Sequence, residues 1–146
     1  MLSRIFTLSA LLVLTLPCLA TAGDGRIPSE RQAQFVVEHL DVTSFPNSIG
    51  PRREPNKRTL LDYGYGSVTY HGDKNAALQG QERDWAIGVT VLAQDETGAV
   101  ICWTDKAENG GSYNVQHPLK LRLNESGFLI ATDEDVSDPR CPSFAR

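Results

Sequence analysis

The sequence predicts an α+β domain in which one N-terminal helix packs on an antiparallel sheet of about five strands built from hairpins. Three observations lead to this fold class. Residues 30–40 show apolar residues at helical spacing, and two pairs of alternating segments flank turn sequences at residues 95–98 and 124–127. The chain also has the length of one domain once an N-terminal leader is set aside.

The first 22 residues have the pattern of a secretory signal peptide. Arg4 supplies a positive charge, residues 5–16 are almost continuously apolar, and Ala20-Thr21-Ala22 is a small-x-small cleavage sequence. The apolar run is too short for a membrane span, which needs about 20 residues. We therefore expect cleavage after Ala22, with lipidation of Cys18 or retention of the leader as the alternatives. We also expect a single domain over residues 23–146 and export to the periplasm.

The expected mature domain is acidic. Residues 23–146 hold 13 Lys and Arg against 18 Asp and Glu, which gives a net charge of −5. A nucleic-acid partner would need a broad basic field, so this balance argues against one. No segment after residue 22 approaches 18 consecutive apolar residues, and we expect no membrane span in the mature chain.

Residues 30–40 predict an amphipathic helix followed by a long loop. The apolar residues at helical spacing are Ala33, Val36, Val37 and Leu40. Ser29, followed three residues later by Gln32, predicts a capping box at the start of this helix. The loop, residues 44–58, has three prolines, one glycine and four cations against one anion; we call it the basic loop.

The rest of the chain is predicted to form strands. Alternation over residues 61–70, interrupted by Gly64 and Gly66, predicts a bent strand. Residues 85–91 and 99–103 form one expected hairpin around the turn at 95–98, and residues 119–123 and 128–132 form a second around 124–127. The expected core residues on these strands are Trp85, Ile87, Val89, Ile101, Leu121 and Ile130.

Two cysteines remain after the expected cleavage. Cys102 and Cys141 are predicted to form a disulfide, because an exported protein folds in an oxidising compartment. Without a C-x-x-C pair, the bond is expected to be a structural link between the tail and a central strand.

Residues that could carry catalysis lack the spacing that catalysis needs. His39, His71 and His117 lie far from one another and from the cysteines, so we expect no metal and no cofactor. The run at residues 64–67 completes neither a nucleophile elbow nor a phosphate-binding loop. His71 with Asp73 is typical of a turn, and the carboxylates at 82–84 and 133–135 are typical of solvated edges. We therefore expect a protein that is not an enzyme, with a small secreted hydrolase as one alternative.

The basic loop is predicted to bind a partner. It is longer than an ordinary connection, and its prolines reduce the entropy lost on binding. Ser44, Asn47 and Ser48 offer compact hydrogen-bonding groups, and Arg52 and Arg53 offer planar donors for carboxylates. A glycoside hydrolase cleft with paired acids matches these groups. In the alternative interpretation, residues 52–58 fold back on the acids at 133–135 or remain solvated.

Two short stretches carry a resemblance to a known group of proteins. With its signal peptide, small acidic domain, one disulfide, hairpin sheet and polar loop, the chain resembles the bacterial periplasmic inhibitors of peptidoglycan hydrolases. The run Asn47-Ser48-Ile49-Gly50-Pro51-Arg52-Arg53, followed by Asp62-Tyr63-Gly64-Tyr65-Gly66, is most similar within that group to immunity proteins that neutralise muramidase or glucosaminidase effectors of type VI secretion. The resemblance implies a partner that degrades peptidoglycan, a lysozyme-like enzyme or a secreted effector. It also implies a function in which the domain occludes the active site of that enzyme.

A non-catalytic envelope binding module is the other alternative. Such a module would dock on an assembly complex or a glycan through exposed aromatic side chains. The candidates for that patch are Tyr63, Tyr65 and Tyr113.

Overall fold

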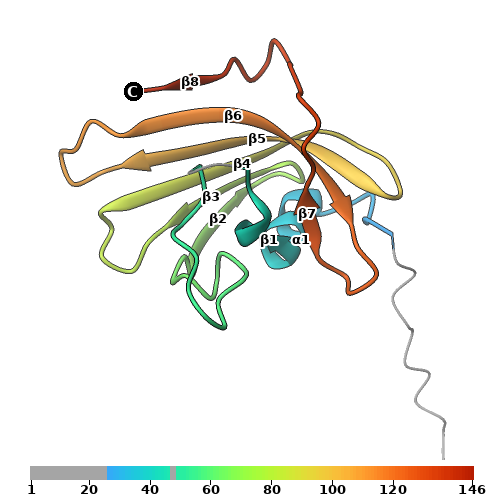
Figure 1. Cartoon of the computed structure of the whole chain (residues 1–146), viewed down its shortest axis with the longest axis horizontal. Helices are drawn as coiled ribbons and strands as arrows, with labels where there is room; N and C mark the ends of the chain where they lie inside the picture. Colours follow the sequence, from blue (N-terminus) through green and yellow to red (C-terminus); the bar gives the residue numbers. More distant parts are fainter. Residues whose placement is uncertain (1–25, 47–48) are drawn as a thin grey trace, which may run out of the picture.

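The protein is a strongly curved sheet that forms half a barrel (Figure 1). The structure, a computed structural model, describes residues 26–46 and 49–146. The strands are β1 (Leu40–Asp41), β2 (Ser67–His71), β3 (Asn75–Gln79), β4 (Trp85–Gln94), β5 (Gly98–Ala107), β6 (Asn114–Leu123), β7 (Leu129–Ala131) and β8 (Phe144–Ala145). Their order in the sheet is β1-β7-β6-β5-β4-β3-β2. The strand β8 pairs with the beginning of β6, whereas β7 pairs with its end. The predicted signal peptide lies outside the described residues.

The predicted fold class is wrong in three respects. The sheet has eight strands rather than about five, and it is mixed, because β1 runs parallel to β7 with Leu40 opposite Leu129. The strands β1, β3 and β8 were not predicted. The helix α1 (Gln32–His39) is not N-terminal, and it is followed at once by β1 and the short 3-10 helix η1 (Val42–Ser44).

The start of the helix also differs from the predicted capping box. Arg31 is the N-cap, in the left-handed region with φ 51°, and no side chain caps the helix. The Gln32 side chain instead donates a hydrogen bond to the carbonyl of Ser29 at 2.9 Å. The amide of Ala33 donates to the carbonyl of Asp73 at 2.7 Å. This bond fixes the start of the helix to the turn between β2 and β3, so tertiary contact replaces the local cap.

Both predicted hairpins are confirmed. In the turn between β4 and β5, one carboxylate oxygen of Asp95 accepts hydrogen bonds from the amides of Thr97 and Gly98. These bonds lower the pKa of Asp95. In the turn between β6 and β7, the side-chain oxygen of Asn124 accepts from the amides of Ser126 and Phe128. Each turn is therefore specified by one Asx side chain.

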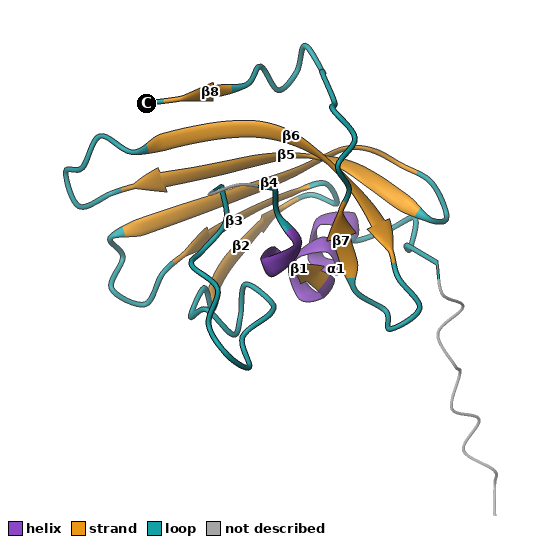
Figure 2. Cartoon of the chain, in the orientation of Figure 1, coloured by secondary structure: helices purple, strands orange, loops and turns teal. Residues whose placement is uncertain are grey.

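The core lies inside the curve of the sheet, where α1 packs against β3 and β4 (Figure 2). Four of the predicted core residues are confirmed as buried: Ile87, Val89, Ile101 and Leu121. Trp85 and Ile130 are only half-buried. The largest fully buried side chain is Trp103 on β5, which faces the basic loop rather than the helix.

Gly98 offers a test of the tight approach between β5 and β6. A Cβ added at Gly98 would lie 2.4 Å from the carbonyl oxygen of Leu121, a backbone atom that cannot rotate away. We expect Gly98→Ala to lower the free energy of unfolding by about 1–3 kcal/mol through strand displacement. Urea unfolding measures this. Gly66→Ala is the control, because Gly66 has no positive φ and no atom lies within 4 Å of an added Cβ, so it separates the steric cost from the cost of losing a glycine.

Candidate functional site

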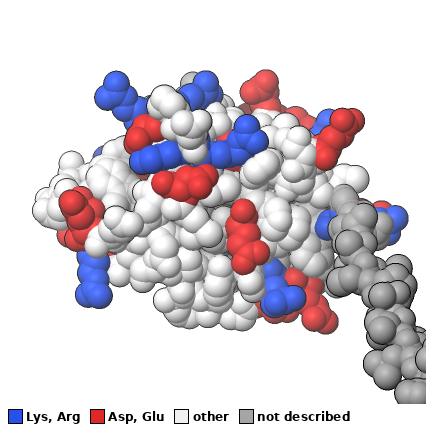
Figure 3. All heavy atoms as spheres, turned by 90° about the horizontal axis from the view of Figure 1, so that it is seen from below, with Lys and Arg blue, Asp and Glu red and all other residues white. Residues whose placement is uncertain are grey.

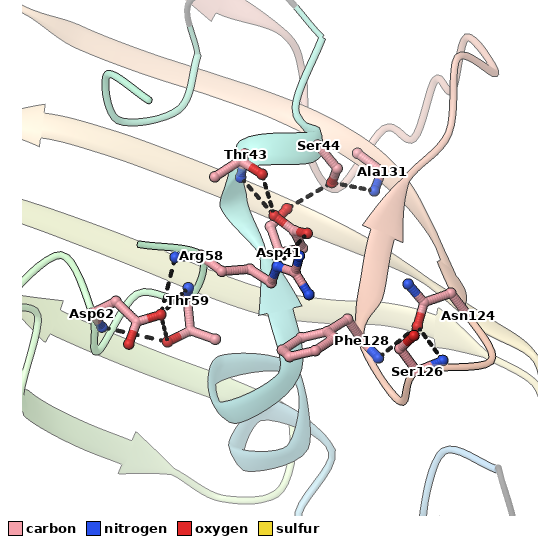
Figure 4. A network of polar contacts seen from close by, with 10 residues as sticks. All are labelled: Asp41, Thr43, Ser44, Arg58, Thr59, Asp62, Asn124, Ser126, Phe128 and Ala131. Carbon is pink, nitrogen blue, oxygen red and sulfur yellow. Dashed lines mark hydrogen bonds and ion pairs between the residues drawn. The ribbon is translucent and has the colours of Figure 1, made fainter. Parts of the chain in front are cut away.

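The basic loop leaves the fold and returns to it at one point. The amide of Val42 donates to the carbonyl of Arg58 at 3.0 Å, which joins the two ends of the loop. The Arg58 guanidinium lies 3.3 Å from the buried carboxylate of Asp41 and 4.6 Å from the centre of the Phe128 ring (Figure 4). A loop of this size with adjoining ends is an Ω loop, a class that is frequently functional.

The first half of the loop packs into the curve of the sheet. Phe45 is buried and meets Trp103 edge to face, with ring centres 4.8 Å apart. The indole N–H of Trp103 donates to the carbonyl of Ile49 at 3.1 Å. A Cβ added at Gly50 would lie 2.9 Å from the Phe45 ring. The backbone can approach this ring closely because Gly50 has no side chain. The loop thus covers the core and is not a free protrusion.

The second half of the loop is held by the turn that follows it. One carboxylate oxygen of Asp62 accepts from the amides of Thr59 and Arg58, and these bonds lower the pKa of Asp62 (Figure 4). The amide of Glu54 donates to the Tyr63 hydroxyl at 3.1 Å. Lys57 lies over the Tyr63 ring, so Tyr63 contacts the loop at two points and restrains it.

Arg52 and Arg53 lie at the outer part of this restrained loop, and both are exposed. A hollow of about 330 Å³ opens beside them. It is lined by Val42, Thr43, Phe45, Gly50, Pro51, Arg52 and Arg53. Within the part of the chain that the structure describes, no ion pair or side-chain hydrogen bond uses either guanidinium. Two forked donors are therefore presented to solvent on a positioned backbone.

The other predicted partner-binding residues are placed differently. The Ser44 hydroxyl donates to the carbonyl of Asp41 at 2.6 Å and accepts from the amide of Ala131 at 2.8 Å, so it links η1 to β7 (Figure 4). Asn47 and Ser48 lie outside the described residues. Of the predicted set, the structure brings together Arg52 and Arg53, while Ser44 is engaged in the fold.

In the alternative interpretation, the loop folds back on the acidic tail. In the structure, charged residues of both segments form ion pairs with other partners. Glu134 pairs with Lys120 on β6. Lys57 pairs with Glu54 inside the loop at 2.9 Å. Among the described residues, no ion pair joins residues 52–58 to the acids at 133–135.

The predicted disulfide is confirmed. Cys102 and Cys141 are bonded, with Cα atoms 5.6 Å apart, and pack with Leu92 on the outer side of the sheet. Arg140 donates to the carbonyl of Leu92 at 3.1 Å, and its pair with Asp138 lowers the pKa of Asp138 to about 2. The disulfide thus fixes the tail on the face opposite the basic loop.

Sequence reasoning missed a second polar group, the carboxylate of Asp105. Asp105 is on the inner face of β5, and its side chain is only 6% exposed. The signal was present, because Ile101 and Trp103 alternate inward and Asp105 is the next inward position. A carboxylate where the pattern requires an apolar side chain marks an unusual environment.

The described residues show neither a metal centre nor a membrane-spanning helix. Residues 26–46 and 49–146 contain no group of three His, Cys, Asp or Glu side chains placed to hold a metal ion. No helix within the same ranges is long and apolar enough to cross a membrane. No protein-family model matches this chain, no curated protein matches its sequence, and no solved structure matches its fold.

Proposed function

We propose that this protein is a periplasmic inhibitor, of the immunity-protein kind, that blocks the active site of a lysozyme-like peptidoglycan glycoside hydrolase. Arg52 and Arg53 enter the substrate cleft and pair with the catalytic carboxylates. The observation that carries the proposal is the exposed pair of guanidinium groups, which have no ion pair within residues 26–46 and 49–146. The loop that holds them is tied to the fold at its two ends and its middle.

Restraint of the loop favours tight binding. A loop that is already ordered loses less conformational entropy when the partner arrives. The anchors are the Val42–Arg58 backbone bond, the Trp103 indole and the Tyr63 hydroxyl. Each acts on a different part of the loop, so the backbone near Arg52 and Arg53 is positioned before binding.

The charge distribution fits a basic enzyme as target. Acidic and basic side chains are interspersed on the face seen in Figure 3, with uncharged surface between them. The expected mature domain carries a net charge of −5, which attracts a basic hydrolase at long range and raises the association rate. The two arginines then meet the acidic catalytic centre within that basic enzyme.

The double variant Arg52→Ala/Arg53→Ala tests this proposal. We expect inhibition to weaken at least tenfold, because both charge-assisted contacts with the catalytic acids are lost. The measurement is the rate of peptidoglycan clearing by a panel of lysozyme-type muramidases and glucosaminidases, titrated with purified protein.

A matched control removes the same charge elsewhere. Lys74 and Arg122 are exposed cations outside the basic loop, and Lys74→Ala/Arg122→Ala should leave inhibition within twofold. If the Arg52/Arg53 variant inhibits as well as the unchanged protein, the loop has no part in binding. If the unchanged protein inhibits no enzyme of the panel, the inhibitor function itself is overturned.

A further inference from the structure

Asp105 occupies a position that belongs to the core. Across the sheet it stands opposite Ile87 on β4 and Val115 on β6, both buried. Trp103, the preceding inward residue of β5, is completely buried. A carboxylate in this row disfavours folding unless it is paired or serves a purpose of its own.

Aromatic side chains from three segments gather near this carboxylate. The indole N–H of Trp85 donates a hydrogen bond to Asp105, and the Trp85 ring lies 5.3 Å from the ring of Tyr113 at a 32° tilt. Burial, Asp105 and Asp84 together raise the pKa of Tyr65 to about 12. Burial and then the charge of Asp105 raise the pKa of Tyr113. We call these five residues, Tyr65, Asp84, Trp85, Asp105 and Tyr113, the Asp105 cluster.

Asp84 directly precedes β4, at the same end of the strands as Asp105. A Cβ added at Gly80 would lie 3.8 Å from both a carboxylate oxygen of Asp84 and the ring of Tyr65. The cluster therefore combines two carboxylates with three aromatic rings. Asp84 and the three rings are half-buried, so their outer sides contact solvent.

The two acids have no cationic partner among the described residues, whose ion pairs do not include Asp84 or Asp105. Lys106, the neighbour of Asp105 in sequence, points to the outer face and lies 3.8 Å from Glu108. A negative charge in surroundings of low dielectric acts more strongly at the nearby ring faces than it would in water.

We propose that the Asp105 cluster binds the cationic side chain of a lysine or arginine on a protein partner. The cation rests against the exposed faces of Trp85 and Tyr113, with Asp84 beside it and Asp105 beneath the rings. Aromatic rings attract cations through their quadrupole, and the buried carboxylate adds to that attraction. Recognition needs no opening of the fold, because the rings are already half-exposed.

The cluster is close to the basic loop but independent of its arginines. Trp103 holds the loop carbonyl of Ile49, and Asp105 is the next residue on the same face of β5. A partner that binds the loop could therefore also contact the cluster with a basic residue of its own. The inference stands even if that partner is not a hydrolase.

Titration of small cations, followed through the indole N–H signal of Trp85 by NMR at pH 7.5, tests the inference. The probes are Nα-acetyl-lysine amide and Nα-acetyl-arginine amide, with Nα-acetyl-norleucine amide as the uncharged control. We expect a saturable shift with both cations and none with norleucine. An equal shift with norleucine, or no shift with any probe, would overturn the proposal.

Two variants complete the test. Asp105→Asn keeps an oxygen that accepts from Trp85 and removes the charge, and it should weaken cation binding at least tenfold. Asp133→Asn removes one charge from the exposed tail and should change binding less than twofold. The spectrum of each variant reports whether it is folded. If folded Asp105→Asn binds the cations as tightly as the unchanged protein, Asp105 is a structural group only.

Discussion

Replacing Trp103 with alanine is expected to lower the free energy of unfolding by about 3–5 kcal/mol, the usual cost of truncating a buried indole. Trp103 has no exposed surface and lies between the sheet and the basic loop. The change removes the edge-to-face contact with Phe45 and leaves the Ile49 carbonyl without its donor. Urea unfolding at constant pH measures the loss.

The variant Trp103→Phe separates packing from hydrogen bonding. Phenylalanine retains a ring that can meet Phe45 but has no N–H for Ile49, so we expect a smaller loss of about 1–3 kcal/mol. The amides of residues 49–58 should then exchange faster with solvent, while the amides of β4 and β5 keep their protection. If loop exchange in Trp103→Phe equals that of the unchanged protein, the indole does not position the loop.

The local parts of this fold were predictable from the sequence. The turns around Asp95 and Asn124 each place an Asx side chain where it accepts from amides two to four residues ahead. Such bonds depend only on neighbours in the chain, and the alternation on either side fixes which residues face inward. The disulfide followed from the expected oxidising compartment and from the number of cysteines.

The non-local parts were not predictable in the same way. The strand β1 has two residues and exists only because β7 lies beside it, and β8 exists only because β6 has a free edge there. Sequence patterns in segments this short do not distinguish a strand from a loop. Likewise, the predicted bent strand over residues 61–70 is wrong in its first part, because residues 61–64 form a turn and β2 begins only at Ser67. Asp62 folds this first part into a turn by accepting from two amides behind it.

The candidate site likewise has features that local sequence predicts and features that depend on tertiary contacts. The exposure of Arg52 and Arg53 followed from the polar, proline-rich composition of the loop. The anchoring of that loop through Phe45 and Ile49 required knowing that Trp103 lies beneath it. The Asp105 cluster required the sheet register, because Trp85 on β4 and Asp105 on β5 meet Tyr113 from the turn between β5 and β6.

Replacing Asp105 with asparagine is expected to stabilise the protein at alkaline pH, by at most about 3 kcal/mol. Burial raises the pKa of Asp105 from 3.8 to about 6, and the hydrogen bond from Trp85 opposes this rise only in part. The groups facing Asp105 are Trp85, Tyr65, Tyr113 and Asp84, none of them cationic. The folded protein therefore holds a proton that the unfolded chain releases at lower pH. Its stability falls as pH rises from about 4 through about 6.

The comparison of Asp105→Asn with the unchanged protein isolates this effect. Below pH 4 both side chains are neutral and the two proteins should have similar free energies of unfolding. Above pH 7 the unchanged protein holds a buried charge and the variant does not, so the difference should reach a plateau. Asp95 and Asp138, whose pKa values are lowered, act in the opposite direction and only at acid pH, and they are the same in both proteins. Urea unfolding between pH 4 and pH 8 measures the difference. If the difference does not depend on pH, burial of the Asp105 charge has no electrostatic cost. The argument for a cation-binding site beside Asp105 would then fail.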